Sequence, residues 1–459
     1  MALGVNLGRD PGKGEDGGNG RVFYPHYAWV IVTVIAVMQM VGTSVRMAFG
    51  VFIEPLEVSF GWSQGTITLA YAITSLVTAL SSPFAGWFGD RFGARKAMAV
   101  GTALFLVGMI LTGYISQPWH LYLYFGVLLG VAQAMFLVPL IPAAMLWFRR
   151  HLGVGMGLIM AAWGLGPALA APAIGAMIQY MEWQQAFLAL GVGSALIMAG
   201  LIVVFRNKPS DRGILPYGHR PGDPSPEEKV VDPQRIKMFN GHMRRTAAYW
   251  NLSSIHFLGC VGHAVILIYI IPLAVSEGLS LVTAAALLTV MSAVSIISRI
   301  AVPILCEHMG TRTVMAIFYF LQGITVVSLF WTHDPWMFYL FAVLFGIGYG
   351  GETGGFPILN RKYYGHAPTG SPYGIQMLGA GLGMALGGWV GGPIYDMTGS
   401  YDLALMIAIV ASLAGMVSIV VLEPTHKILI PDWEVEQVFG TEGHGVSNPE
   451  PAPTGSGAD

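Results

Sequence analysis

Twelve long apolar runs, separated by short polar breaks, constrain the fold of this chain more than any other feature. An α-helix needs about 20 mostly apolar residues to cross the hydrocarbon core of a bilayer. Only 10% of the residues are charged, against about 25% in soluble domains. We therefore predict an all-α membrane protein with twelve transmembrane helices. The runs are residues 27–53, 66–88, 97–115, 120–147, 152–179, 185–205, 247–275, 281–305, 313–332, 336–359, 371–393 and 401–422.

Polar segments divide the chain into two groups of six runs. Residues 206–246 contain six prolines and many charges, which predicts a hydrophilic linker. Residues 1–26 form a polar, Gly-rich tail without the short apolar core of a cleavable signal peptide. Residues 423–459 are acidic and then Gly- and Pro-rich, so we expect a second tail. The bundles are thus expected at 27–205 and 247–422.

The distribution of basic residues predicts the orientation. Of the 23 Lys and Arg residues, all but Arg46 and Arg299 fall in the tails, the linker or the loops after even-numbered helices. Cytoplasmic loops of membrane proteins are rich in Lys and Arg, so we expect the linker and both termini in the cytoplasm. The net charge of −2 and the scattered basic residues give no indication of nucleic-acid binding.

One polar loop, GWFGDRFGARK at 86–96, lies between the second and third runs. Gly93 permits a chain reversal that a Cβ would hinder, and Gly86 lets a neighbouring helix approach closely. Asp90 and Arg91 can pair and can cap helix ends, and Arg95 and Lys96 mark the cytoplasmic side. The spacing resembles the signature loop of the major facilitator superfamily. That resemblance implies a cytoplasmic gating motif and two related six-helix bundles.

The second half repeats this loop in altered form. EHMGTR, from Glu307 to Arg312, aligns with DRFGAR at 90–95, and acid, Gly and Arg recur at the same spacing. A repeated loop in two groups of six helices fits the paired bundles of transporter folds. We therefore add Glu307 and Arg312 to the expected gating motif.

Arg299 lies in the eighth apolar run, where a charge is expensive and suggests a function by default. Its planar guanidinium suits a carboxylate, although a structural or snorkelling role stays open. The run resembles the eighth helix of the monocarboxylate transporter family. There a substrate-binding Arg stands eight residues before the acid of the repeated loop, as Arg299 does before Glu307. The Asp that animal members carry four residues before the Arg is Ser295 here, so their Arg–Asp coupling scheme does not transfer unchanged.

Arg46 is the second charge inside an apolar run. Its surroundings, RMAFGVFIEPLEVSFGWS, resemble bacterial members of the same family, and WFRRHLGVGMGLIMAAWGLG from Trp147 resembles the family's second signature. The first signature is not matched, since FYPHYAW stands there. Arg46 is expected to attract the anion or to close the pocket from outside; snorkelling to the outer interface is the alternative.

Tyr349 and Glu352 lie one turn apart in the tenth run and share a helix face. Tyr349 resembles a Tyr of bacterial members that faces the bound carboxylate. Glu352 is the only acid deep in an apolar run, and a carboxyl group in such surroundings can carry a proton near neutral pH. A structural ion pair with Arg46, Arg299 or Arg361 is the other interpretation of Glu352.

His256, Cys260 and His263 share one face of the seventh helix. Without a further Cys or acid nearby in sequence we expect no metal site, and we interpret the histidines as packing or proton-coupling residues. The two cysteines, Cys260 and Cys306, make no disulfide framework. Three further residues are candidates for lining the cavity, namely Tyr269, Gln133 and Trp163.

The sequence thus predicts a secondary active transporter of small, monocarboxylate-like organic anions, coupled to protons and working by alternating access. It is not expected to be an enzyme or to hold a cofactor. Its resemblance to bacterial transporters places it in the inner (plasma) membrane, and its oligomeric state stays open. Alternatives are a carboxylate/carboxylate antiporter, as in the similar oxalate–formate exchangers, a facilitator for another solute such as a drug or sugar, and, from a different class, a membrane sensor.

Overall fold

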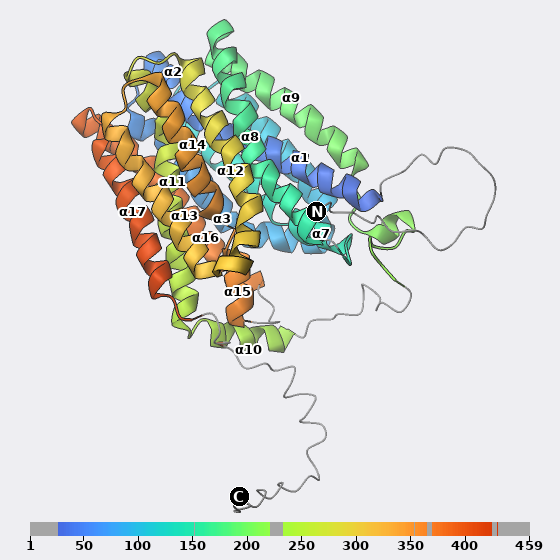
Figure 1. Cartoon of the computed structure of the whole chain (residues 1–459). Helices are drawn as coiled ribbons and strands as arrows, with labels where there is room; N and C mark the ends of the chain where they lie inside the picture. Colours follow the sequence, from blue (N-terminus) through green and yellow to red (C-terminus); the bar gives the residue numbers. More distant parts are fainter. Residues whose placement is uncertain are drawn as a thin grey trace, which may run out of the picture.

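The computed structural model describes residues 26–150, 152–220, 233–352, 354–364, 370–424 and 429. Within these residues, eleven helical stretches are long and apolar enough to cross a membrane. Figure 1 shows the long helices running side by side in one bundle, with α10 (Pro233–Met243) lying across their lower ends. The chain is an integral, multi-pass membrane protein with the predicted all-α, twelve-helix architecture. The crossing that is not among these eleven is the tenth in chain order, and it is built from two shorter helices.

The first half contains six crossings. Several of them are built from more than one helical segment, because proline and a change of helix type interrupt the regular hydrogen bonding. In chain order the segments are α1 (Tyr27–Met47), η1 (Phe49–Phe52), α2 (Ile53–Phe60), α3 (Gln64–Phe92), α4 (Ala94–Thr112), α5 (Pro118–Leu121), the π-helical η2 (Tyr122–Leu128), α6 (Leu129–Leu137), α7 (Leu140–Leu146), α8 (Leu152–Tyr180) and α9 (Trp183–Val204).

The second half follows a connection that contains η3 (Pro209–Arg212) and α10. In its tenth crossing one helix ends at Glu352 and the next described helix begins at Phe356, with Gly354 and Gly355 in a turn just before it. The segments are α11 (Ala247–Ser276), α12 (Leu281–Met309), α13 (Thr311–Val326), η4 (Val327–Trp331), α14 (Pro335–Glu352), α15 (Phe356–Tyr364), α16 (Gly370–Thr398) and α17 (Asp402–Val421).

The repeated polar loops have the same backbone geometry in both halves. Gly93, between α3 and α4, has φ of 87°, and Gly310, between α12 and α13, has φ of 84°. L-residues with a side chain rarely adopt such angles. The glycine in each loop is therefore required by the sharp helix–helix reversal.

The arginines of the two loops also have equivalent partners. Arg95 donates from Nε to the carbonyl oxygen of Ile202 at 2.9 Å, near the end of α9. Arg312 donates to the carbonyl oxygens of Ile419 and Val420, near the end of α17. Carbonyl groups in the last turn of a helix lack intrahelical partners. Each arginine therefore caps the last helix of its own half.

The two halves are joined by hydrogen bonds at the end of the bundle predicted to face outside, which we call the outer end. Asp396, near the end of α16, accepts hydrogen bonds from the backbone N–H groups of Gln64 and Gly65, both at 2.8 Å. These donors belong to the first turn of α3, where a carboxylate is favoured. Tyr401 adds a bond to the side-chain oxygen of Gln64 at 2.5 Å. We call these four residues the outer latch.

The opposite end of the bundle, predicted to face the cytoplasm, has polar contacts of a different kind. Arg95 and Arg312 bind within their own halves, as described above. Asn360 on α15 exchanges two hydrogen bonds, of 2.8 and 2.9 Å, with Gln376 on α16 in the same half. The described contacts between the halves thus hold the outer end closed.

Candidate functional site

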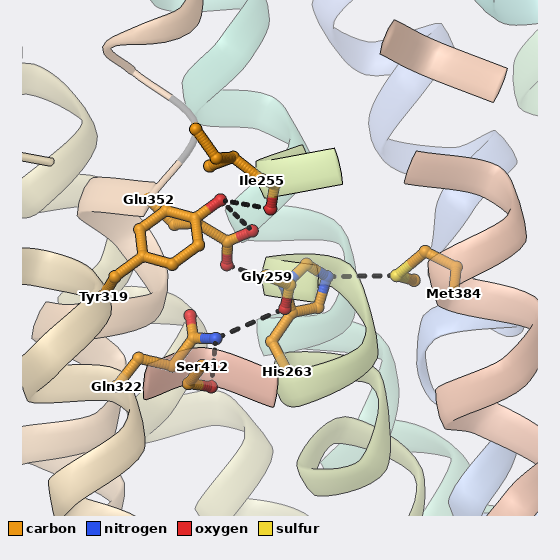
Figure 2. Close-up of polar contacts among 8 residues, drawn as sticks. All are labelled: Ile255, Gly259, His263, Tyr319, Gln322, Glu352, Met384 and Ser412. Atoms are coloured by element: carbon orange, nitrogen blue, oxygen red, sulfur yellow. Dashed lines mark hydrogen bonds and ion pairs between the residues drawn. The ribbon is translucent and has the colours of Figure 1, made fainter. Parts of the chain in front are cut away.

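A buried acid and histidine occupy the interior of the second half. Glu352, the last residue of α14, is fully buried, and its Oε2 lies 2.8 Å from Nδ1 of His263 on α11. The other carboxylate oxygen accepts a 3.4 Å hydrogen bond from the hydroxyl of Tyr319 on α13. Figure 2 shows these side chains converging from three helices. Burying a charged group away from water is energetically costly, so a charge on one of these two side chains must be compensated by the other.

The second nitrogen of His263 has a partner as well. Nε2 lies 3.0 Å from the sulfur of Met384 on α16, as Figure 2 shows. A thioether sulfur has no hydrogen to donate, so a hydrogen bond here requires the hydrogen on Nε2. In that tautomer Nδ1 and the carboxylate oxygen are both acceptors, and a hydrogen bond across their 2.8 Å separation requires one shared proton.

Gly259 makes room for the carboxylate. A Cβ on this glycine would collide with Oε1 of Glu352 and with the Tyr319 hydroxyl. Its carbonyl oxygen accepts a bond of 3.3 Å from Gln322, which also donates to Ser412 at 3.0 Å. The pair thus sits in a polar network that stiffens its surroundings.

Tyr349 connects this pair to Arg299. The centroids of the Tyr349 and His263 rings are 5.0 Å apart, and the guanidinium carbon of Arg299 lies 5.1 Å from the Tyr349 ring centroid. A guanidinium at this distance interacts favourably with an aromatic face. The structure therefore brings together four residues that the sequence singled out, namely Arg299, Tyr349, His263 and Glu352.

Arg46 lies in the other half and is also buried, with 9% of its surface exposed. Its Nη1 donates to the hydroxyl of Ser75 at 3.2 Å, and its guanidinium carbon is 5.6 Å from the ring centroid of Tyr71. Since Arg46 is buried against α3, the described geometry does not match the alternative in which it snorkels to the membrane surface.

The remaining candidates have varied surroundings. His256 stacks on Phe356, with ring centroids 4.2 Å apart. Gln133 donates to the carbonyl oxygen of Gly42, and Trp163 is half-buried. Tyr269 accepts from the backbone N–H of residue 392 at 2.8 Å and lies 2.9 Å from the carbonyl oxygens of 388 and 389. Substrate contact by these residues stays a prediction.

The gating residues lie at the predicted cytoplasmic end. Asp90 and Arg91 are exposed. Arg91 lies over the Trp87 ring at 5.9 Å and Lys96 near the Phe92 ring at 6.0 Å. A Cβ on Gly86 would lie 3.3 Å from a methyl group of Val138, which fits a close helix approach. The side chains of Glu307 and Arg361 are outside the described residues.

One group of side chains could in principle hold a metal. Cys260, His263 and Glu352 each offer a ligand atom, and these atoms lie within 4.8 Å of one another. However, the nitrogen and oxygen nearest each other are already joined by the 2.8 Å hydrogen bond. We therefore interpret the group as a hydrogen-bonded pair beside a cysteine.

Sequence reasoning missed several members of the site, because they become neighbours only through folding. Tyr319 and Gln322 could have been found, since they lie three residues apart as polar residues in the apolar run 313–332. Gly259, Met384 and Tyr71 carry no signal of their own in the sequence.

Comparison with known proteins adds independent information. The family profile described as Major Facilitator Superfamily matches residues 34–374 and 304–442. Monocarboxylate transporter 12 of Homo sapiens is 21% identical over 409 residues, which cover 83% of this chain and 77% of the relative. The Oxalate:formate antiporter of Oxalobacter formigenes is 23% identical over 403 residues, covering 84% of this chain and 89% of the relative.

A solved structure has a similar fold. It is a bacterial homolog of the human lysosomal transporter Spinster, in an inward-facing and unoccupied conformation. The TM-score is 0.63 at 15% identity, and the match covers 87% of this chain and 95% of the other. This likeness concerns the arrangement of the helices alone.

Proposed function

Because the chain belongs to the Major Facilitator Superfamily, we propose that it is a secondary active transporter of small carboxylate anions coupled to protons. Arg299 binds the carboxylate, Tyr349 adds a hydrogen bond, and the Glu352–His263 pair holds the proton. The observation that carries the proposal is the contact series Arg299–Tyr349–His263–Glu352, with the spacings of 5.1, 5.0 and 2.8 Å given above. The similar monocarboxylate transporters and oxalate:formate antiporter support the substrate class.

The coupling is electrostatic. When the pair loses its proton, a negative charge remains beside Tyr349 and opposes a carboxylate at Arg299. When the proton returns, that repulsion disappears and the carboxylate binds more tightly. By linkage, substrate binding also favours protonation. Proton and anion therefore travel together as the halves rock around the site.

The outer latch and the loop at 86–96 are the two gates of this cycle. The latch closes the outer end when the site faces the cytoplasm. Asp90, Arg91 and Arg95, together with the equivalent Glu307 and Arg312, close the opposite end in the other state. Both termini and the linker at 206–246 face the cytoplasm, and the membrane is the bacterial inner membrane.

Exchange of one carboxylate for another is the second candidate, favoured by the similarity to the oxalate:formate antiporter. The two modes differ in what drives accumulation. Purified protein in liposomes is tested with a panel of labelled carboxylates, with and without a pH gradient. Symport requires uptake that follows the gradient into empty vesicles. Exchange requires uptake only into vesicles preloaded with carboxylate, and the proposal fails if neither condition gives uptake.

A further inference from the structure

A groove lies between α13 and α17, which pack side by side in the second half (Figure 1). Its volume is about 590 Å³. Arg312 stands at the end of the groove that is predicted to face the cytoplasm, and apolar residues continue the groove along the two helices, namely Ala316, Ile317, Phe320 and Met416. The groove thus has one charged end and one apolar length.

The apolar length opens towards lipid. Both helices are long and apolar enough to cross a membrane. Ile317 and Phe320 on α13 are 46% and 47% exposed, and Val420 on α17 is 58% exposed. Apolar side chains that point outward from a membrane crossing meet lipid tails, which are as apolar as they are. The groove is therefore accessible to a hydrocarbon chain.

Arg312 makes the other end positive. Its Nε and Nη2 bind carbonyl oxygens at the end of α17, while Nη1 has no hydrogen-bond partner among the described residues. Lys362 on α15 donates to the hydroxyl of Thr311, another lining residue, at 3.0 Å. None of the described lining residues is acidic. This end therefore favours an anion and has a charged donor to offer it.

The first half has a side chain of its own at the equivalent place. The amide oxygen of Asn207, which follows α9, accepts from the backbone N–H of Arg95 at 3.0 Å. The same side chain fills the space beside Gly93, since a Cβ on this glycine would lie 3.0 Å from the amide nitrogen. The first loop is thus closed by its own chain.

The second half leaves this place open. The offset along the chain that relates Arg95 to Arg312 also relates Asn207 to Pro424. A proline side chain has no group that accepts a hydrogen bond, and a Cβ on Gly310 would meet no described atom within 4 Å. The second loop therefore has room and positive charge where the first loop has its own acceptor, so an acceptor from outside the chain fits there.

We propose that this groove binds a phospholipid with an anionic head group. The phosphate accepts from Arg312, and one acyl chain lies between α13 and α17. Basic pockets at the cytoplasmic ends of membrane helices suit such head groups, and bonds from a guanidinium to a phosphate are among the strong ones. The bound lipid links the start of α13 to the end of α17, whichever solute the protein transports.

Lipid binding to the purified full chain in detergent tests the proposal. The probes are phosphatidylglycerol and phosphatidylcholine with identical chains, and native mass spectrometry measures the affinity of the most tightly retained lipid. We expect the parent to bind phosphatidylglycerol at least about fivefold more tightly, because phosphatidylcholine carries a cation beside its phosphate. Arg312→Gln should lose this preference. Ala316→Trp, which fills the groove and keeps Arg312, should weaken phosphatidylglycerol binding by a similar factor.

Arg95→Gln is the matched control. It removes the equivalent cap of α9 in the half that Asn207 closes, so it should keep the preference for phosphatidylglycerol. Equal affinity of the parent for both lipids overturns the proposal. A preference that survives in both groove variants, or that Arg95→Gln abolishes as fully as Arg312→Gln does, also overturns it. If Arg312→Gln does not fold, the parent and Ala316→Trp still decide the question.

Discussion

Glu352→Gln is the sharpest test of how protons drive transport. Gln has nearly the same shape, and its amide N–H can donate to Nδ1 of His263, which lies 2.8 Å from Oε2 of Glu352 in the parent. Removing one partner of a buried ion pair outright costs about 3–5 kcal/mol. Here only a charged bond becomes a neutral one, so the loss should be about 1 kcal/mol. The variant is therefore expected to fold.

The effect on coupling should be much larger. One proton per substrate turns each pH unit into about 1.4 kcal/mol of driving force, which supports about tenfold accumulation at equilibrium. A Gln side chain does not titrate, so in Glu352→Gln position 352 stays uncharged, as it is in the proton-bound form of the pair. Accumulation by Glu352→Gln should fall to the level set by substrate concentration alone, while exchange of substrate for substrate continues.

The assay compares two measurements on the same liposomes. Uptake of labelled substrate is followed to equilibrium under an inward gradient of one pH unit, and exchange is followed without a gradient. Tyr319→Phe is the matched control, because it removes the long 3.4 Å bond to Glu352 and the 3.1 Å bond to the carbonyl oxygen of Ile255 but keeps the carboxylate, and it should keep accumulation. Accumulation by Glu352→Gln equal to that of the parent would refute the role of Glu352 as proton carrier.

Three further variants test other parts of the structure. Arg299→Lys should bind carboxylate at least about tenfold more weakly in equilibrium titrations, because a point charge lacks the planar fork of donors. An affinity equal to that of the parent would show that Arg299 does not bind the carboxylate. Asp90→Asn should slow turnover but spare equilibrium affinity, since the loop lies far from the pocket, and the reverse pattern would contradict a gating role. Asp396→Asn should weaken the outer latch by about 1 kcal/mol after allowance for solvent exposure. Thiol labelling from outside of a cysteine placed at Thr68 should then be about fivefold faster, and an unchanged rate would count against the latch.

The number and order of the helices could be predicted from the sequence, because a bilayer demands long apolar runs. The ends and interruptions could not. The first run, 27–53, continues helically to Phe60 and ends at Gly61, whose φ is 65°. The tenth run, 336–359, breaks after Glu352. Apolar composition records burial in lipid, whereas these details depend on local backbone geometry.

The sequence predicted which residues belong to the candidate site better than it predicted which of them contact each other. Helical spacing placed Tyr349 and Glu352 on one face, and burial cost singled out Arg299. An arginine partner is the alternative interpretation of Glu352 from the sequence, whereas in the described residues its close partner is His263, 89 positions away in the chain. Such a pairing depends on how α11 and α14 pack, which no local pattern encodes.

The repeated loops also bear on how the two halves have diverged. Gly93 and Gly310 share one backbone angle, and Arg95 and Arg312 cap the last helix of their own half. If the halves descend from one duplicated gene, each copy inherited the same contacts within its own half, so the same residues persist at these positions. Asp90 and Arg91 are exposed, and Glu307 and His308 stand in their places. Divergence after duplication is thus greater at these exposed loop positions than at the glycine and arginine that hold each half together.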